Sequence, residues 1–331
     1  MAASRFSLRK CFFLLVLCAL GLQLMQPALA QERWPTKPVK LVVPFPASGT
    51  ADGVARILAQ KLSVAWGQQV VIENRSGAGG NLGTEAVAKS APDGYSLVMV
   101  SGSIPTINPY IYKRLPFDVK RDLTPITNVA TGPMLVLVPD SSPAKNIKEL
   151  IAQGKAKPGS LNLGSAGVGS QVHMAGENFA YAAGIEITHV PYRGETVAFV
   201  DLIAGQLQLM VGNLGVASTQ LGPGRLRALA VTSKTRSTLL PNVPTVAESG
   251  LPGFESTGWF GLMAPASTPK DILAKIQRDT ARALGDTDVK ARLYVMGMAP
   301  VGNSTVDFAK AIDTESKRWA EVIKSRNITA N

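Results

Sequence analysis

The sequence predicts an α/β protein that is built on parallel β-sheets and divided into two domains. Short apolar runs rich in β-branched residues, typical of buried strands, alternate with segments whose apolar residues recur at helical spacing. Such alternation favours parallel sheets joined by right-handed crossovers. The roughly 300 residues that follow position 30 exceed the usual size of one domain, so we expect two.

The N-terminal third of the chain contains three strand patterns. We expect strands at residues 40–45, 69–73 and 95–100, since these runs are apolar and are bounded by turn-forming residues. Apolar residues at helical spacing predict a helix between the first two strands, and Gly67 is a typical helix end. A second helix is expected between the second and third strands, ending at Ala88.

The middle of the chain repeats the pattern. One helix is marked by Ile147 and Leu150 and should end at Gly154, and another follows a glycine-rich loop and should run through Tyr181. The expected strands of this region are residues 134–138, 161–163, 187–190, 207–211 and 226–231.

The C-terminal quarter is expected to be mostly helical. Residues 268–271, Thr-Pro-Lys-Asp, predict a capping box with proline at the first helical position. Ser304 and Asp307 predict a second box before a final helix that runs through Ile323. Both caps are structural signals and say nothing about function.

Two extended-looking stretches suggest where the chain passes between domains. Residues 124–133 and 254–265 both lie between helix-rich zones. We interpret them as two crossings, which makes the first domain discontinuous. The expected domains are residues 31–129 with 257–331, and residues 130–256.

The first 30 residues have the pattern of a cleaved export signal. Three basic residues precede an apolar run at residues 11–22, and Ala28-Leu29-Ala30 is a typical cleavage site. A membrane anchor is the first alternative, but the apolar run is short for a span. A lipoprotein anchored at Cys18 is the second, but the preceding residues are bulky. We expect cleavage before Gln31, which removes both cysteines and leaves a chain that needs no disulfides.

The charge balance remains positive after cleavage. Three of the 34 basic residues and none of the 23 acidic ones are removed, so the formal charge falls from +11 to +8. A positive balance suits an anionic small ligand, a polyanion, an anionic membrane surface or an ordinary solvated surface. The basic residues are scattered and lack aromatic interleaving, so we expect no nucleic-acid partner. No apolar run after residue 30 is long enough to embed the chain in a membrane.

Two loops share one design that suits an anionic ligand. Residues 46–52 and 164–170 each lead from a buried strand, through small side chains, to a helix N-terminus. Small side chains let a ligand approach the backbone, where free N–H groups and the helix dipole favour negative charge. Each loop alone could be an ordinary strand-to-helix turn. Two matching loops, one in each expected domain, favour a clamp on a carboxylate.

Motifs for nucleotide binding and catalysis are missing from the sequence. There is no P-loop lysine, Leu82 replaces the third glycine of a dinucleotide fingerprint, and no nucleophile elbow occurs. His173 and His189 lack the spacing of metal ligands, so we expect no metal site. His173 either faces a ligand cleft between the two expected domains or has only a structural role. Asp52 either caps a helix that begins at Gly53 or accepts a hydrogen bond from the ligand.

Several segments also resemble a known family. They are LVVPF at residues 41–45, ENRSGAGGNLGTEAVAKSAPDGYSL at 73–97, LNLGSAGVGSQVHMAGE at 161–177, HVPYRG at 189–194 and RALAVTSKTRSTLLPNVPTVAESGLPGFE at 227–255. In these the chain resembles the Bug family, the extracytoplasmic solute receptors of tripartite tricarboxylate transporters. The resemblance covers residues 33–328.

The resemblance implies a fold and a function. It implies a two-domain Venus flytrap like that of periplasmic binding proteins, with a mainly parallel sheet flanked by helices in each domain. It also implies a periplasmic location, no enzyme activity and no cofactor. A small carboxylate would be held between the domains and passed to membrane subunits of a transporter, and we expect the receptor to be a monomer.

The family's binding loops carry over to named positions of this chain. Together with His173 and Asn213, the expected ligand contacts are Pro46, Ala47, Ser48, Gly49, Thr50, Asp52, Ser101, Gly102, Ser165, Ala166, Gly167, Gly169, Ser170, Tyr192 and Gly194. Two departures leave the identity of the ligand open. Ala47-Ser48-Gly49 replaces part of a stretch that usually has two glycines, and Gly212 stands where the family usually has an aspartate.

The expected function is therefore capture of a small organic anion for transport. A sensor that presents its closed form to a signalling partner is an alternative with the same sequence pattern. An enzyme that uses Asp52 with His173 is a second alternative, disfavoured because the sequence offers no nucleophile–base pair.

Overall fold

The computed structural model describes residues 34–326 and 328–330. The predicted export signal and its cleavage site lie outside these residues. The fold below is that of the compact unit Lys37–Asn331, taken by itself.

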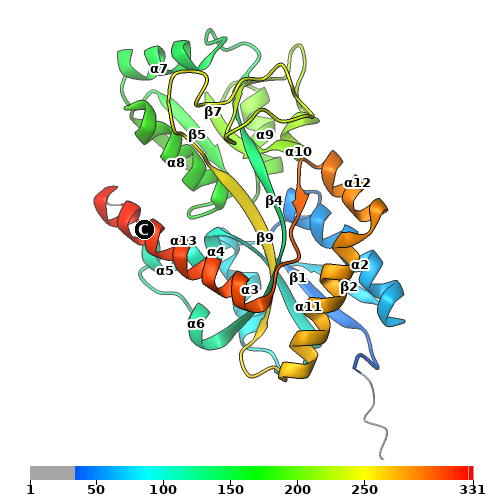
Figure 1. Ribbon diagram of the computed structural model, residues 1–331. Helices are drawn as coiled ribbons and strands as arrows, with labels where there is room; N and C mark the ends of the chain where they lie inside the picture. The colour runs from blue at the N-terminus through cyan, green and yellow to red at the C-terminus, as the bar shows by residue number, and fades with distance from the viewer. Residues whose placement is uncertain (1–33, 327, 331) are drawn as a thin grey trace, which may run out of the picture. The chain divides into compact units, whose positions relative to one another are not determined.

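A single mixed β-sheet runs through this unit (Figure 1). Its main order is β2-β1-β3-β9-β4-β7-β5-β6, and β10 and β8 also pair with β4. The strands are β1 (Val39–Val43), β2 (Val70–Asn74), β3 (Ser96–Ser101), β4 (Leu123–Pro139), β5 (Leu161–Ser165), β6 (Ile187–Pro191), β7 (Leu209–Asn213), β8 (Leu226–Val231), β9 (Thr257–Pro265) and β10 (Ala299–Pro300).

The sheet has parallel strands at both ends and antiparallel strands in the middle. β1 pairs in parallel with β2 and β3, and β5 pairs in parallel with β6 and β7. These are the predicted parallel sheets, and the α/β class is confirmed. The sheet as a whole is mixed because β9 is antiparallel to both β3 and β4, and β4 is antiparallel to β7 and β8.

The two predicted crossing segments pair with each other. Residues 124–133 belong to the N-terminal part of β4 and run antiparallel to β9, from the pair Leu123–Pro265 to the pair Pro133–Thr257. The C-terminal part of β4 pairs with β7 and β8 instead. We call β2, β1, β3, β9, β10 and the first part of β4 the first half of the sheet. The second half comprises the rest of β4 with β8, β7, β5 and β6.

Helices cover both faces of each half. In the first half α2 packs on β1 and β2 beside α11, while α3, α4 and α13 pack on the other face (Figure 1). The helices are α2 (Thr50–Trp66), α3 (Asn81–Ala88), α4 (Ser103–Thr106), α5 (Asn108–Ile111), α6 (Val119–Asp122), α7 (Ile147–Ala156), α8 (Gln171–Ala183), α9 (Glu195–Ile203), α10 (Leu214–Ser218), α11 (Lys270–Gly285), α12 (Thr287–Val295) and α13 (Thr305–Arg326), with a 3-10 turn at Ala78–Gly80.

The burial of β4 explains its uninterrupted apolar sequence. Met134 and Val136 pack into one cluster with residues of α7 and α8, while Leu135 and Leu137 pack into another with residues of α9 and α10. Successive side chains of a strand point to opposite faces. Because both faces are covered by helices, every position in this part of β4 is apolar.

Several predicted helix boundaries differ from the structure. α7 continues past Gly154 to Ala156. α11 does not use the predicted capping box, because Pro269 itself is the N-cap residue and Thr268 Oγ1 donates to the Pro265 carbonyl at 2.7 Å. The second box is confirmed in its main contact, since Ser304 Oγ accepts from the Asp307 N–H at 3.1 Å.

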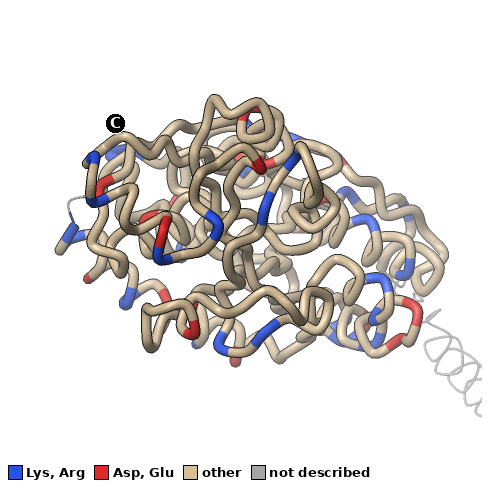
Figure 2. The backbone as a smooth tube through the Cα atoms, turned by 90° about the horizontal axis from the view of Figure 1, so that it is seen from above, with Lys and Arg blue, Asp and Glu red and all other residues tan. Residues whose placement is uncertain are grey.

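Helices of the two halves also meet away from the sheet. Met174 of α8 is fully buried in a cluster with Ile107 and Ile111 of the first half and Trp319 and Ile323 of α13. Within the described residues, none of the helices combines the length and apolar character that a membrane crossing needs. Lys and Arg are spread along the described chain with Asp and Glu between them (Figure 2).

Candidate functional site

A pocket lies where residues of both halves of the sheet meet. It encloses about 30 Å³ that the centre of a water molecule can reach. Its lining residues are Phe45, Pro46, Gly49, Thr50, Ala51, Ser101, Ala166, Ser170, Gln171, Val172, Gly194, Glu195, Thr196, Asn213 and Phe260.

Three helix N-termini converge on this pocket. Gly49-Thr50-Ala51 begins α2, Ser170-Gln171-Val172 begins α8, and Gly194-Glu195-Thr196 begins α9; each triplet is the N-cap residue followed by the first two helical residues. First-turn N–H groups have no intrahelical acceptor, and the helix dipole adds positive potential at the same place. The pocket is therefore suited to an anionic group held by backbone donors.

The start of α2 is open toward the pocket because its N-cap residue is a glycine. Gly49 provides no side-chain cap. The helix begins at Thr50, three residues earlier than predicted, so Asp52 lies in the first turn rather than before it. The Asp52 carboxylate accepts hydrogen bonds from the Ser48 N–H at 3.0 Å, Arg56 Nε at 2.8 Å and Asn74 Nδ2 at 2.9 Å.

These contacts hold Asp52 away from the pocket. Its side chain is buried and does not belong to the lining. Burial raises the pKa of this carboxyl, but the hydrogen bonds from Arg56, Asn74 and Ser48 outweigh burial and leave the pKa below its ordinary value. Asp52 thus fixes the loop in which Ser48 adopts a positive φ of 67°.

Both histidines of the chain contact the glycine-rich loop before α8, residues 164–170. The Gly169 N–H donates to His173 Nδ1 at 3.1 Å, and Ser165 Oγ lies 2.6 Å from His189 Nε2. The two imidazole rings stack with centroids 3.7 Å apart. Burial, followed by the charge of His173, lowers the pKa of His189 to about 3. Both rings therefore support the loop and do not line the pocket.

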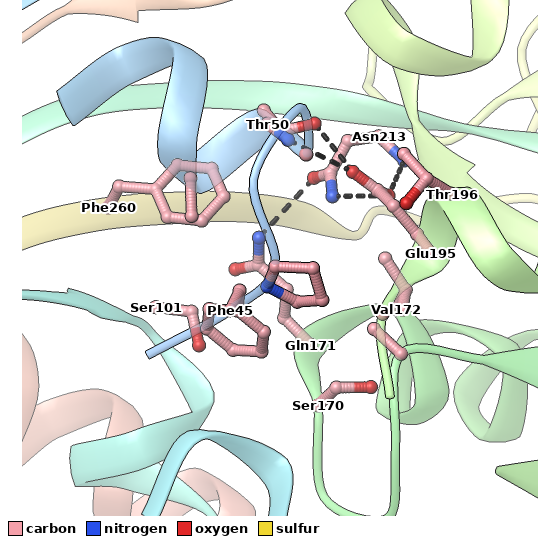
Figure 3. A pocket seen from close by; sticks show the side chains of 15 residues that line it. Phe45, Thr50, Ser101, Ser170, Gln171, Val172, Glu195, Thr196, Asn213 and Phe260 are labelled. Carbon is pink, nitrogen blue, oxygen red and sulfur yellow. Dashed lines mark hydrogen bonds between the residues drawn. The ribbon is translucent and has the colours of Figure 1, made fainter. Parts of the chain in front are cut away.

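Glu195 bridges the two halves across the pocket (Figure 3). Its Oε1 accepts from the Thr50 hydroxyl at 2.6 Å and from the Thr50 N–H at 3.3 Å. Its Oε2 accepts from Asn213 Nδ2 at 2.8 Å and from the Asn213 N–H at 3.2 Å. The α2 N-terminus of the first half is thus joined to α9 and β7 of the second half by a carboxylate of the protein itself.

The network continues beyond Glu195. Gln171 Nε2 donates to Asn213 Oδ1 at 3.3 Å (Figure 3). Gln171 Oε1 also accepts from the Trp259 N–H at 3.2 Å. Trp259 belongs to β9 of the first half, so this chain of contacts also crosses between the halves. In this structure the pocket walls are joined by these neutral donors and one carboxylate.

About half of the predicted contact residues line the pocket. Those that do are Pro46, Gly49, Thr50, Ser101, Ala166, Ser170, Gly194 and Asn213. The structure places Ala47, Ser48, Asp52, Gly102, Ser165, Gly167, Gly169, His173 and Tyr192 outside the lining of the pocket.

The predicted residues outside the lining have structural contacts of their own. The Ser165 hydroxyl also accepts from the Gly167 N–H at 3.1 Å. The Tyr192 hydroxyl donates to Asp201 at 2.6 Å, and burial together with this carboxylate raises the pKa of Tyr192 to about 12. Asp52 and His173, the pair that an enzyme would need, each have other partners and both lie outside the pocket.

Sequence reasoning missed one whole wall of the pocket. α9 was not predicted, although Ala198, Phe199 and Leu202 follow Gly194 at helical spacing. Gln171 and Val172 could have been predicted as contact residues, since they form the first turn of the helix after Ser170. For Glu195 the signal was weaker, because an acid in the first turn of a helix is common and its contact with Thr50 spans 145 residues.

Comparison with known proteins assigns the family. The family model described as tripartite tricarboxylate transporter family receptor matches residues 54–328. The chain belongs to this family. The protein BugT of Bordetella pertussis is 36% identical over 297 residues, covering 89% of this chain and 91% of BugT.

Two solved structures of similar sequence have the same fold as this chain. The R. palustris protein Rpa4515, solved with adipate, has a TM-score of 0.86 and 37% identity, covering 89% of this chain and 99% of its own. MatC (Rpa3494) from Rhodopseudomonas palustris, solved with bound malate, has a TM-score of 0.83 and 32% identity, covering 88% of this chain and 100% of its own. The predicted resemblance to the Bug family and the periplasmic-binding-protein-like fold are thereby confirmed.

Proposed function

We propose that this chain is a periplasmic receptor that captures a small carboxylate between its two halves and delivers it to membrane subunits of a transporter. The observation that carries the proposal is the convergence of the N-termini of α2, α8 and α9 on one pocket. Backbone N–H groups and helix dipoles favour a carboxylate without a lysine or arginine. The adipate and malate bound to the two family members support the same class of ligand.

Ligand entry requires the halves to separate. Hydrogen bonds from Thr50 to Glu195 and from the Trp259 N–H to Gln171 join the halves across the pocket. In the proposal, residues 31–129 with 257–331 form one domain, residues 130–256 form the other, and β4 and β9 connect them. A ligand that contacts both domains favours the closed state over the open one by its difference in affinity for the two.

Thermal denaturation of the mature protein, residues 31–331, tests this function. Straight-chain mono- and dicarboxylates of three to six carbons, with and without an amino group, are added one at a time. A ligand present at 100 times its dissociation constant should stabilise the protein by about 2.7 kcal/mol. The protein should release this ligand chemically unchanged. Lack of any stabilisation across the series, or recovery of a converted product, would contradict the proposal.

A further inference from the structure

Glu195 is the feature of the pocket that the capture of a carboxylate does not require. Among the described residues that line the pocket, it is the only one with an ionisable side chain. It is 6% exposed, and no lysine, arginine or histidine of the described chain forms an ion pair with it. A buried carboxylate in a site for carboxylates carries the same charge as the proposed ligand.

The contacts of Glu195 use the full acceptor capacity of its carboxylate. Two hydrogen bonds from Thr50 reach Oε1, and two from Asn213 reach Oε2. A carboxylate accepts about four hydrogen bonds. The Asn213 contacts lie within the second half of the sheet, whereas the Thr50 contacts cross to the first half, so only Oε1 loses its partners when the halves separate.

We infer that Glu195 selects ligands that carry an ammonium group as well as a carboxylate, and that it disfavours dicarboxylates of the same length. This inference rests on the proposed function. If the ligand's carboxylate takes the Thr50 donors, Oε1 is left buried without a partner, which is costly unless the ligand supplies a donor. If Glu195 keeps Thr50, the ligand lies beside a fixed negative charge, and a second carboxylate is repelled.

An ammonium group on the ligand would satisfy Glu195 in either arrangement. It supplies three N–H donors and a positive charge, and charge-assisted hydrogen bonds are roughly twice as strong as neutral ones. The donors that now hold Glu195 are neutral, from Thr50 and Asn213. Amino acids and ω-amino acids are therefore the class of carboxylate that this pocket suits. Such a site discriminates because a ligand of the wrong kind leaves a buried charge without a partner.

Matched ligand pairs test the inference by titration calorimetry. The dicarboxylates succinate, glutarate and adipate are compared with 3-aminopropanoate, 4-aminobutanoate and 5-aminopentanoate, and butanoate and pentanoate with their 2-amino derivatives. For the wild type, we expect the tightest amine-bearing ligand to bind at least about tenfold more tightly than the ligand of its pair that lacks the amine. Glu195→Gln keeps the shape but removes the charge, and should shrink that ratio by about tenfold or more.

Glu186→Gln is the matched control, because Glu186 is an exposed glutamate of the same half and its loss changes the net charge equally. Its ratio should equal that of the wild type. Each ratio is taken within one variant, so a lower folded fraction cancels. The inference is overturned if the wild type prefers the partner without the amine in every pair, or if Glu195→Gln leaves the ratio unchanged. If no ligand of either series binds the wild type, the proposed function itself fails.

Discussion

Asp52 and Glu195 are both first-turn acids of a helix, yet they serve the pocket in different ways. Asp52 is bound within the first half by Ser48, Arg56 and Asn74, so it shapes the loop that precedes α2. Glu195 reaches across to the start of the same helix and becomes part of the pocket wall. Glu195 is the first residue of its helix and Asp52 is the third, so the two side chains leave their helices in different directions and meet different residues.

The role of backbone donors leads to a prediction for Arg193. This residue follows Tyr192 in the turn before α9, and its side chain is exposed. Because three helix N-termini already supply donors and positive potential, Arg193→Ala should weaken ligand binding by less than about tenfold, or roughly 1.4 kcal/mol. Titration calorimetry with the tightest ligand of the series measures this. A loss of two orders of magnitude in a folded variant would instead indicate a direct ion pair.

The stacked histidines lead to a prediction for pH. The pKa of His189 is about 3 in the folded protein, against an ordinary value of 6.5. Between these two values the unfolded chain binds more protons than the folded one, so stability falls as the pH falls. One proton corresponds to at most about 1.4 kcal/mol per pH unit. Above pH 7 this contribution is fully present and constant.

Urea denaturation at pH 7.5 and pH 5 measures this effect. His189→Gln keeps a polar group near Ser165 but does not titrate, so the variant should lose less stability between the two pH values than the wild type does. The expected difference is on the order of 1–2 kcal/mol. Equal losses in both proteins would show that His189 is not the group responsible.

At the scale of elements, the close approach of the glycine-rich loop, residues 164–170, to the first half leads to a further prediction. Gly169 has a φ of 78°, and a Cβ placed there would lie 2.5 Å from both Asn108 Oδ1 and Ile111 Cδ1 of the first half. Gly169→Ala should therefore hinder closure and weaken ligand binding by about tenfold or more. Isothermal titration with the tightest ligand of the series provides the measurement.

Gly184→Ala is the matched control. Gly184 also has a positive φ, 63°, but a Cβ there meets no atom within 4 Å. Both variants should lose about 1–2 kcal/mol of stability from the left-handed backbone, while only Gly169→Ala should lose affinity. Similar affinities in the two variants would mean that the loop does not need to approach the first half for binding.

The elements that sequence reasoning found and missed differ in a physical way. Strands such as residues 161–163 and helices such as the one from Thr50 carry strong local periodicity, which the sequence shows directly. The length of β4 could not be predicted, because Pro125 and Pro133 interrupt its pattern and their tolerance depends on pairing with β9. The pocket loops were predicted from strand–loop–helix junctions, whereas the contact of Glu195 with Thr50 depends on the tertiary fold.

At the scale of the molecule, β4 and β9 allow one chain to present the proposed binding loops from two sides. β4 pairs with β9 in the first half and with β7 and β8 in the second, so the two halves share a continuous strand. Residues far apart in the sequence, such as Thr50 and Glu195, can then face each other across a pocket. Closure of one half against the other is the motion that the proposed function requires.

Export of the whole protein gives a prediction outside the described residues. The basic segment, the apolar run and Ala28-Leu29-Ala30 predict that the signal is removed in the periplasm. Intact-mass spectrometry of the periplasmic fraction should identify Gln31 as the first residue. A mature protein that retains residues 1–30, or one that starts at a lipid-modified Cys18, would be inconsistent with cleavage at this site.

In the proposed function, helix N-termini from both halves hold the ligand's carboxylate. A crystal structure of residues 31–331 with the tightest carboxylate of the calorimetric series is the most direct test. We expect the carboxylate oxygens to lie within hydrogen-bond distance of first-turn N–H groups of both α2 and α8, at Thr50 or Ala51 and at Gln171 or Val172. A carboxylate paired with a lysine or arginine, or bound to one half alone, would contradict it.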